Sequence, residues 1–450
     1  MAFGRSPFTV GGVTFRPTGV RKSLVTPSQP TKVENEWLPL SNLDRVVTPA
    51  FSSTIHFFDG GVSTDRGFES VVASLKQSLA EVLVHFFPLA GRLELRDDGH
   101  VDLHCNDAGA IFIQASVGVT LEELGGPQPM DALSELEIAR LGKGPIYMPD
   151  QLMSMPALVV QLLAPRQQPD PSLVQGYSTQ SAHNLNNVMN DRGTQKSFTG
   201  SSERPVINTF HLDKMTVQKM KDRANEELGQ EAVRKFTTAE GISAILWQKM
   251  TQARRADRES CHADAQTGDG EFNGPNRIQT RFFMFVDGRK KLDMPAGYFG
   301  NVVCSACAVS TEETILENSS VYAAGLIREA CKKVDADYFR SLIDWVEVQG
   351  SNPSKSEHVN SAGHDVAATF WTFFPLYEME FGFGKPVYAA RNSPPRPLID
   401  GIAMMPSSKG PGNMVALLNL SADRMARLRK DSAFQNSFIG MNSKLDADSY

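Results

Sequence analysis

The side chains in this sequence that could transfer a proton or bind a metal ion include nine histidines and five cysteines. Cys304 and Cys307 have the spacing of half a zinc site, but no second pair stands at zinc spacing. The two residues lie inside an apolar run that reads as a strand, on which their thiols would point to opposite faces. We interpret this pair as part of a hydrophobic core and expect no bound metal ion.

Several motifs that would assign another chemistry are missing. The sequence has no Gly-x-x-x-x-Gly-Lys-Ser/Thr loop and no Gly-x-Gly-x-x-Gly motif after a strand. It also has no His-Glu-x-x-His motif and no Gly-x-Ser-x-Gly turn. Nucleotide hydrolysis, dinucleotide-dependent redox chemistry and α/β-hydrolase chemistry therefore lose their usual sequence support.

The composition is typical of a globular protein with two or three domains. The 450 residues include 45 Lys and Arg against 51 Asp and Glu, a net charge of −6. Because no basic field is present to attract phosphates, we expect no nucleic-acid partner. Five cysteines in a long chain fit free thiols, and no apolar run approaches the ~18 to 20 residues of a spanning helix. We expect a cytoplasmic monomer without membrane contact.

Hydrophobic periodicity predicts the elements that would position the reactive side chains. In the first half it predicts an amphipathic helix over 68–87 and strands over 52–58, 93–95, 101–105 and 158–163. In the second half it predicts strands over 208–212, 281–286, 302–309, 369–374 and 414–420, with helices over 215–224, from the capping box Thr237–Glu240, over 316–334 and after Ser421.

Two polar stretches interrupt this pattern. Residues 165–205 consist mostly of Gln, Asn, Ser, Thr, Gly and Pro, which indicates a long loop or linker between two halves. Residues 256–276 are polar and Gly-rich and are interpreted as a surface excursion. Strands and helices alternate in both halves without a repeat, so we predict a mixed α/β architecture with two sheets.

Six short segments follow one another in an order and spacing that together are specific. They are Leu38 to Asp44, Phe87 to Leu93, Val286 to Arg289, Gly297 to Val302, Thr369 to Trp371, and Glu380 to Pro386. Taken together, they make the sequence resemble the plant BAHD acyl-CoA-dependent acyltransferases over nearly its whole length.

The resemblance implies a fold of two chloramphenicol-acetyltransferase-like α/β domains, each a mixed sheet with flanking helices, and a channel between them. It implies a first domain over 1–190 with a returning segment at about 365–400, a crossover linker over 191–209, and a second domain over 210–364 with about 401–450. It also implies acyl transfer to an alcohol or amine in a sequential mechanism. Acyl-CoA is then a co-substrate, and no resident cofactor is expected.

The general base of that family lies in a His-x-x-x-Asp motif. The match here is His183, with Asn187 at the position of the Asp and Val188 in place of the usual Gly. In the family the carboxylate pairs with an arginine, and the resemblance assigns that place to Arg289. An Asn can accept a hydrogen bond from a guanidinium but lacks the charge of the bidentate pair. None of the other eight histidines is followed by a carboxylate at this spacing.

Two further segments carry roles implied by the resemblance. Glu380-Phe381-Gly382-Phe383-Gly384 stands for the family's Asp-Phe-Gly-Trp-Gly and is assigned to the framework and the shape of the cofactor channel, with Gly382 and Gly384 supplying backbone angles that side chains forbid. Thr369 and Trp371 precede Pro375 at the spacing where the family places groups near the acceptor and the developing oxyanion. A hydroxyl and an indole N–H can each donate one hydrogen bond there. The alternative is that strand alternation makes both of them core residues.

We therefore expect an acyltransferase that acts on a small specialised metabolite of plant secondary metabolism, with turnover impaired by Asn187. One alternative is a non-catalytic relative that keeps the scaffold and a groove for CoA or a metabolite. Another is that residues 165–205 come from a truncated gene model.

Overall fold

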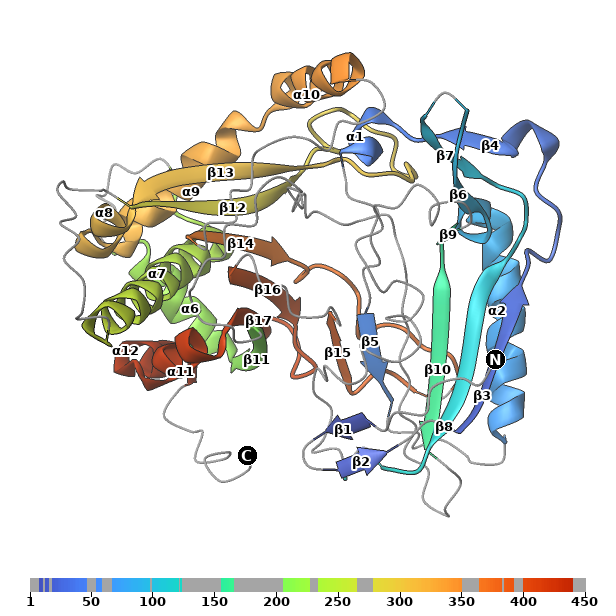
Figure 1. The fold of residues 1–450 in the computed structure, drawn as a ribbon, viewed down its shortest axis with the longest axis horizontal. Coiled ribbons are helices and arrows are strands. Elements are labelled where there is room, and N and C mark those ends of the chain that lie inside the picture. The colour runs from blue at the N-terminus through green and yellow to red at the C-terminus, as the bar shows by residue number, and fades with distance from the viewer. Residues whose placement is uncertain are drawn as a thin grey trace.

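The fold combines several sheets with helices packed mainly on their outer sides (Figure 1). The computed structural model describes residues 8–10, 13–15, 18–46, 54–58, 67–97, 99–120, 122–123, 155–165, 205–226, 234–264, 278–349, 364–382, 384–391 and 400–439. Over these residues the strands form sheets of six, four, three, two and two strands. This is the mixed α/β architecture that the sequence predicts, although the first half contains more than one sheet.

A three-stranded sheet covered by one long helix forms the centre of the first half. Its order is β10-β8-β3, with β10 parallel and β3 antiparallel to β8. The helix α2 (Phe68–His85) buries Val72, Leu75 and Leu83 in the core of this layer, which confirms the predicted amphipathic helix. The strands are β3 (Thr18–Val25), β8 (Ala110–Val117) and β10 (Val159–Pro165).

Two smaller sheets are formed entirely by strands of the first half. The predicted hairpin is confirmed, since β6 and β7 pair antiparallel with Leu93 opposite Leu103. A 3-10 helix over Phe87–Ala90 precedes it, where Pro88 follows the end of α2. The bounds are β4 (Trp37–Pro39), β6 (Arg92–Leu95), β7 (Val101–His104) and β9 (Met155–Pro156) in one sheet, and β1 (Phe8–Val10) and β2 (Val13–Phe15) in the other.

The second half is built on the six-stranded sheet. Its order is β11-β17-β16-β14-β12-β13, in which β14 runs parallel to both β12 and β16. The strands are β11 (Pro205–Leu212), β12 (Gln279–Asp287), β13 (Val303–Thr311), β14 (Asp365–Phe370), β16 (Asp400–Pro406) and β17 (Met414–Ser421). The strand from 400 was not predicted.

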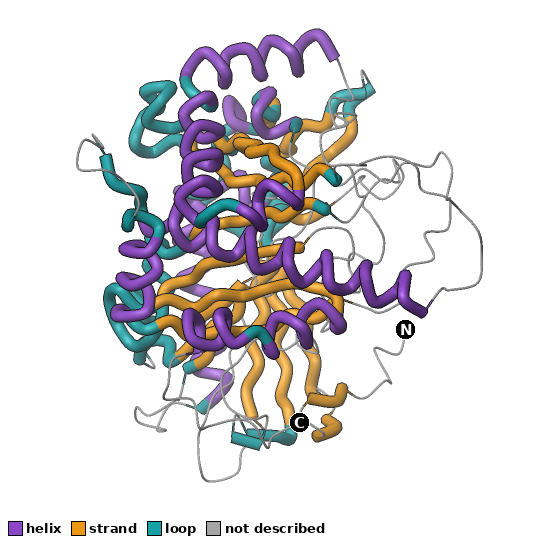
Figure 2. Tube along the Cα trace, turned by 90° about the vertical axis from the view of Figure 1, so that its left-hand side faces the viewer, coloured by secondary structure: helices purple, strands orange, loops and turns teal. Residues whose placement is uncertain are grey.

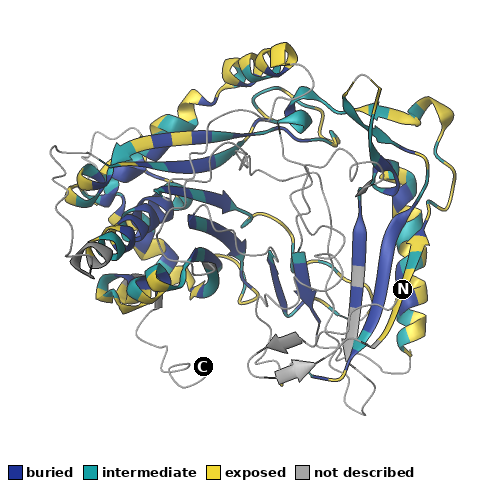
Figure 3. Ribbon diagram, in the orientation of Figure 1, coloured by how far each residue is buried: buried dark blue, intermediate teal, exposed yellow. Residues whose placement is uncertain are grey.

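Helices cover one face of this sheet, and Figure 2, seen from that side, shows them in front of the strands. The central strands of this sheet are largely buried (Figure 3). The helices are α6 (Lys214–Arg223), α7 (Thr238–Asp264), α8 (Glu312–Glu317), α9 (Ser320–Lys333), α11 (Ala422–Lys430) and α12 (Ser432–Phe434), followed by a π-helix over Gln435–Ile439. A further helix, α10 (Ala336–Gln349), packs against the short α1 (Asn42–Arg45).

Three predicted elements differ from the observed ones. The helix expected over 316–334 is two helices, because Asn318 and Ser319 lie between them in extended backbone, with Ser319 at the N-cap position of the second. Residues 256–264, expected to belong to a surface excursion, are instead the last residues of α7, and the rest of the expected excursion, 265–276, lies outside the described residues. The capping box is confirmed: Thr237 Oγ1 accepts from the Glu240 N–H, and Glu240 Oε2 accepts from the Thr237 N–H.

The strand expected over 369–374 ends at Phe370, and residues from Trp371 onward form turns. The segment expected to return to the first domain over about 365–400 therefore divides. β14, at its start, pairs with β12 and β16 and belongs to the second sheet, which corrects that part of the expectation. β15 (Tyr388–Arg391) pairs antiparallel with β5 (Thr54–Phe57), a strand of the N-terminal residues. The remaining domain limits stay a prediction.

The face of the six-stranded sheet opposite the helices packs against residues from the first half. Ala403, Met405 and Leu417 from this sheet share a hydrophobic cluster with Phe57 of β5 and Val117 of β8. This cluster, which we call the central cluster, joins the two halves of the chain. Among the described residues, no helix combines the length and apolar character needed to cross a membrane.

Candidate active site

The predicted proton acceptor lies outside the described residues. His183, Asn187 and Phe383 all fall in this category, so their predicted roles stay predictions. The remaining predicted residues, Thr369, Trp371, Arg289, Glu380, Gly382 and Gly384, lie within the structure. They lie in three places: the end of β14, the loop between β12 and β13, and the turn from Glu380.

Thr369 and Trp371 lie at the end of β14, on the side of the sheet that faces the central cluster. Thr369 is buried and stands beside Ala403 in the register of β14 and β16. Trp371 follows the strand, and its backbone N–H donates to the Met404 carbonyl at 2.8 Å. Its side chain is partly buried against the central cluster. The prediction that both residues lie on one strand is wrong, since Phe370 ends β14.

A cation and a second ring surround the Trp371 indole. The Arg391 Cζ lies 5.8 Å from the centroid of the indole, within the range of a cation–π interaction. The Phe374 ring centroid lies 5.4 Å away, and Phe374 donates its N–H to the Trp371 carbonyl at 2.9 Å. The adjoining Phe373 side chain is 93% exposed. The end of β14 thus presents an aromatic surface beside a buried hydroxyl.

His56 on β5 belongs to the same region and was missed by the sequence reasoning, which placed it within an apolar element. Its side chain is 2% exposed, and its Nε2 lies 3.2 Å from Thr54 Oγ1. Burial lowers the pKa of His56 to about 4, against an opposing hydrogen bond with the backbone of Leu376. The imidazole is therefore neutral near pH 7. The available signal was a polar ring in the middle of a buried strand, which requires a hydrogen-bonding partner.

Arg289 lies elsewhere, at the loop between β12 and β13. Its guanidinium donates to Asp287 Oδ1 at 3.1 Å and to the Gly300 carbonyl at 2.7 Å. The adjacent Asn301 donates through its backbone N–H and its side chain to Asp44 Oδ1, at 2.8 and 2.7 Å. Three of the six sequence motifs therefore meet at this loop. The expected partner of Arg289, residue 187, lies outside the described part of the chain.

The segment from Glu380 is a turn whose geometry requires its glycines. Gly382 and Gly384 have φ of +85° and +90°, the left-handed region that side chains disfavour, in agreement with the sequence interpretation. Glu380 is exposed, and Phe381 contacts Phe58, the residue after β5, edge-to-face at 6.2 Å. This segment therefore contacts the chain just after β5 through the Phe381 ring.

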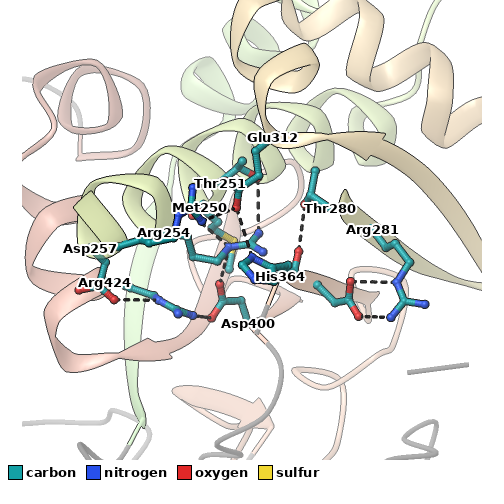
Figure 4. Close-up of polar contacts among 12 residues, drawn as sticks. Met250, Thr251, Arg254, Asp257, Thr280, Arg281, Glu312, His364, Asp400 and Arg424 are labelled. Atoms are coloured by element: carbon teal, nitrogen blue, oxygen red, sulfur yellow. Dashed lines mark hydrogen bonds and ion pairs between the residues drawn. The ribbon is translucent and has the colours of Figure 1, made fainter. Parts of the chain in front are cut away.

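A buried ionic network lies at the other end of the strands, where β14 and β16 begin (Figure 4). The Arg254 guanidinium on α7 pairs with Asp400 at 3.2 Å, and the two side chains are 1% and 6% exposed. Arg424 contacts Asp400 and Asp257, each at 3.4 Å. Burial raises the pKa of Asp400, and Arg254 and Arg424 oppose this shift.

Two carboxylates beside this network are also paired. Arg281 makes a two-bond contact with Asp365, with N–O distances of 3.0 and 2.6 Å. Glu312 accepts from Arg258 at 2.6 Å and lies 3.3 Å from His364 Nδ1. Burial alone would raise the pKa of Glu312, but the bonds from His364 and Arg258 lower it to about 2. Since each charge has a partner, we interpret this network as a support for the strands.

No metal-binding group of three or more His, Cys, Asp or Glu is found within the described residues. Of the cysteine pair on β13, Cys304 is buried and Cys307 exposed. The two thiols thus point to opposite faces of the strand as predicted, although only Cys304 belongs to the core.

Comparison with known proteins covers most of the chain. It matches the profile described as the Transferase family over residues 16–149 and 146–435. It is similar to a hydroxycinnamoyltransferase of Narcissus pseudonarcissus, 28% identical over 91% of this chain and 97% of that protein. Solved structures that it resembles include vinorine synthase, with a TM-score of 0.64 and 18% identity over 92% of this chain and 96% of the other. TRI101 of F. sporotrichioides, complexed with coenzyme A and T-2, matches with a TM-score of 0.68 and 17% identity over 89% and 98% of the two chains.

Proposed function

Because the chain belongs to the Transferase family, the BAHD acyltransferases that its sequence resembles, we propose that it moves an acyl group from an acyl-CoA thioester to a hydroxyl or amine of a small specialised metabolite. The observation that carries the proposal is the family match, which spans residues 16–149 and 146–435 and includes both halves. The named relative is a hydroxycinnamoyltransferase, and a structural neighbour was solved with coenzyme A bound.

The reaction needs a proton acceptor and hydrogen-bond donors for the oxyanion. We assign the first role to His183, whose neutral imidazole takes the proton of the acceptor as its oxygen or nitrogen attacks the thioester carbonyl. The tetrahedral intermediate then collapses, the C–S bond breaks, and the CoA sulfur leaves as thiol after taking up that proton. The Thr369 hydroxyl and the Trp371 indole N–H are the assigned donors near the acceptor and the oxyanion. Their shared position at the end of β14 supports this assignment.

Asn187 in place of the motif's carboxylate lowers the expected rate. A neutral amide holds an arginine less strongly than a carboxylate does, so the segment that carries His183 is less firmly fixed. We propose turnover well below that of relatives with an intact motif.

A panel of acyl-CoA donors and alcohol or amine acceptors tests both proposals when esters or amides are identified by mass. New acylated products confirm transfer. A rate at or above ~1 s⁻¹, ordinary for an enzyme, contradicts the reduced turnover. Binding of acyl-CoA without any product would instead favour a non-catalytic binding protein.

A further inference from the structure

The short helix α1 belongs to the first half by sequence but packs into the second half. Only two residues separate it from β4, a strand that pairs with β7 of the first half. Leu43 of α1 is 5% exposed and shares a hydrophobic cluster with Val302, Val334 and Phe339, all from the second half. Burial of an apolar side chain is favourable only while the residues that cover it stay in place. The packing of Leu43 therefore holds the second half against β4 and β7.

Asp44 uses one carboxylate oxygen for its own helix and the other for the second half. Its Oδ2 accepts from the Ser41 N–H at 3.1 Å and from the Ser41 hydroxyl at 2.6 Å, as part of a capping box. Its Oδ1 accepts from the Asn301 N–H at 2.8 Å and from the Asn301 side-chain amide at 2.7 Å. Hydrogen bonds to a carboxylate are stronger than those between neutral groups. Asp44 thus joins the cap of α1 directly to the loop between β12 and β13.

Two further contacts between the halves lie in this region. The Asn42 side-chain amide donates to the Ile343 carbonyl at 3.1 Å and to Glu347 at 2.8 Å, both on α10. Phe86, the residue after α2, lies edge-to-face with Phe299 at a centroid distance of 6.0 Å. In Figure 1, α1 and α10 lie in the upper part of the view, whereas β5 and β15 of the central cluster lie in the lower part. The halves are therefore connected at two separate places.

The two connections differ in how much apolar surface they bury. The central cluster combines buried apolar side chains of β5, β8, β15, β16 and β17. The contact at α1 relies on the buried Leu43 and on the hydrogen bonds of Asn42 and Asp44, which are only partly buried. Because apolar stabilisation scales with the area removed from water, separation at α1 costs less. Local opening occurs where few apolar contacts are lost, so α1 can detach while the central cluster stays packed.

We propose that α1 is a clasp between the two halves, which opens while the central cluster holds and must be closed for acyl transfer. By the clasp we mean residues 42–44 and their contacts in the second half. This inference rests on the proposed function, which assigns His183 of the first half as the base and Thr369 and Trp371 of the second half as donors. These groups act on one substrate only when the halves are correctly placed, and a misplacement of ~1 Å can cost ~10²-fold in rate.

Hydrogen exchange, followed by mass spectrometry, tests the clasp without any substrate. Asp44→Ala removes both bonds to Asn301, whereas the control Ser41→Ala weakens the same helix cap and leaves those bonds in place. Since a hydrogen bond to a charged group is worth a factor of about ten or more, we expect Asp44→Ala to speed exchange about tenfold over 297–302 and 339–347. Ser41→Ala should have a smaller effect, and β16 should stay unchanged in both variants.

A milder variant shows whether the clasp opens as one unit. Asn42→Ala removes the bonds to α10, and we expect it to speed exchange over 297–302 as well as over 339–347. Exchange over 339–347 that is unchanged in Asp44→Ala, or that rises equally in β16, overturns the inference. In the first case the contacts open independently, and in the second the whole sheet is destabilised.

Substrate and kinetics test whether closure serves the reaction. A substrate that contacts both halves favours the closed form, so saturating acyl-CoA should slow exchange over 339–347 in the unmodified protein. We expect Asp44→Ala to lower kcat at least about tenfold and Ser41→Ala to keep it within about twofold. Faster exchange with unchanged kcat, or no response of exchange to acyl-CoA, contradicts the requirement for closure. If the unmodified protein acylates no acceptor, the proposed function fails, and exchange without substrate still decides whether α1 is a clasp.

Discussion

At the residue scale, His183 carries the largest expected effect. Replacing His183 with Ala removes the assigned proton acceptor, and general base catalysis typically contributes 10²–10⁴-fold, so we expect a loss of about 10²-fold or more in kcat. The melting temperature and acyl-CoA binding should stay nearly unchanged, because a residue of a polar stretch that the sequence predicts to be a loop is expected to contribute little packing. His358→Ala, in another polar stretch, is the control. Activity in His183→Ala close to that of the unmodified protein would rule out this residue as the base.

Asn187 gives the complementary change. Asn187→Asp restores a charge, and a hydrogen bond to a charged group contributes ~1.5–3 kcal/mol, so we expect kcat to rise about tenfold or more. The gain should vanish in an Arg289→Gln background if Arg289 is the partner. A gain that persists there would show that the carboxylate acts on another group, because Arg289 already bonds Asp287 and Gly300.

At the element scale, β14 and β16 run from the buried ionic network to the central cluster. Each begins at a buried carboxylate, Asp365 or Asp400, and β14 ends beside Trp371. Asp400→Asn would leave the buried Arg254 charge less compensated, and such losses typically cost ~3–5 kcal/mol of unfolding free energy. Urea unfolding measures this. The control is Arg255→Met, at the residue next to Arg254 on α7. It breaks an exposed ion pair with Glu259 and should cost only ~0.5 kcal/mol of unfolding free energy. Equal effects of the two changes would contradict the role assigned to the network.

The elements that sequence periodicity predicted are those with one buried face. The apolar steps of α2 and the alternation of the β6–β7 hairpin gave their positions within a few residues. β8 was missed because its residues are nearly all buried, so no alternation marks it as a strand. The end of β14 was misplaced because Trp371 and Phe374 are as apolar as strand residues, although they form a turn.

The candidate site was less predictable than the fold. Thr369 and Trp371 were found through their motif, whereas Arg391, whose guanidinium lies over the indole, belongs to β15. β15 pairs with β5, and no local pattern reveals a pairing between residues more than 300 positions apart. The same holds for the network of Arg254 and Asp400, which joins α7 to the start of β16.

At the scale of the whole molecule, the two halves meet through the central cluster, and the proposed reaction requires them to bind a common substrate. A ligand that binds only the folded state stabilises it by ~2.7 kcal/mol at 100 times its dissociation constant. We therefore expect saturating acyl-CoA to raise the melting temperature, with adenosine alone as the control for weak nucleotide binding. A folded protein whose melting temperature does not respond to any acyl-CoA would contradict the assignment of acyl-CoA as co-substrate.

The most direct measurement follows CoA and acylated acceptor together. The purified protein is supplied with a saturating acyl-CoA, with and without an alcohol or amine acceptor, and both products are quantified over time. Acyl transfer predicts that release of CoA depends on the acceptor and that one acylated acceptor forms for each CoA released. Release of CoA at the same rate without acceptor, or the absence of acylated product from every acceptor tried, would contradict it.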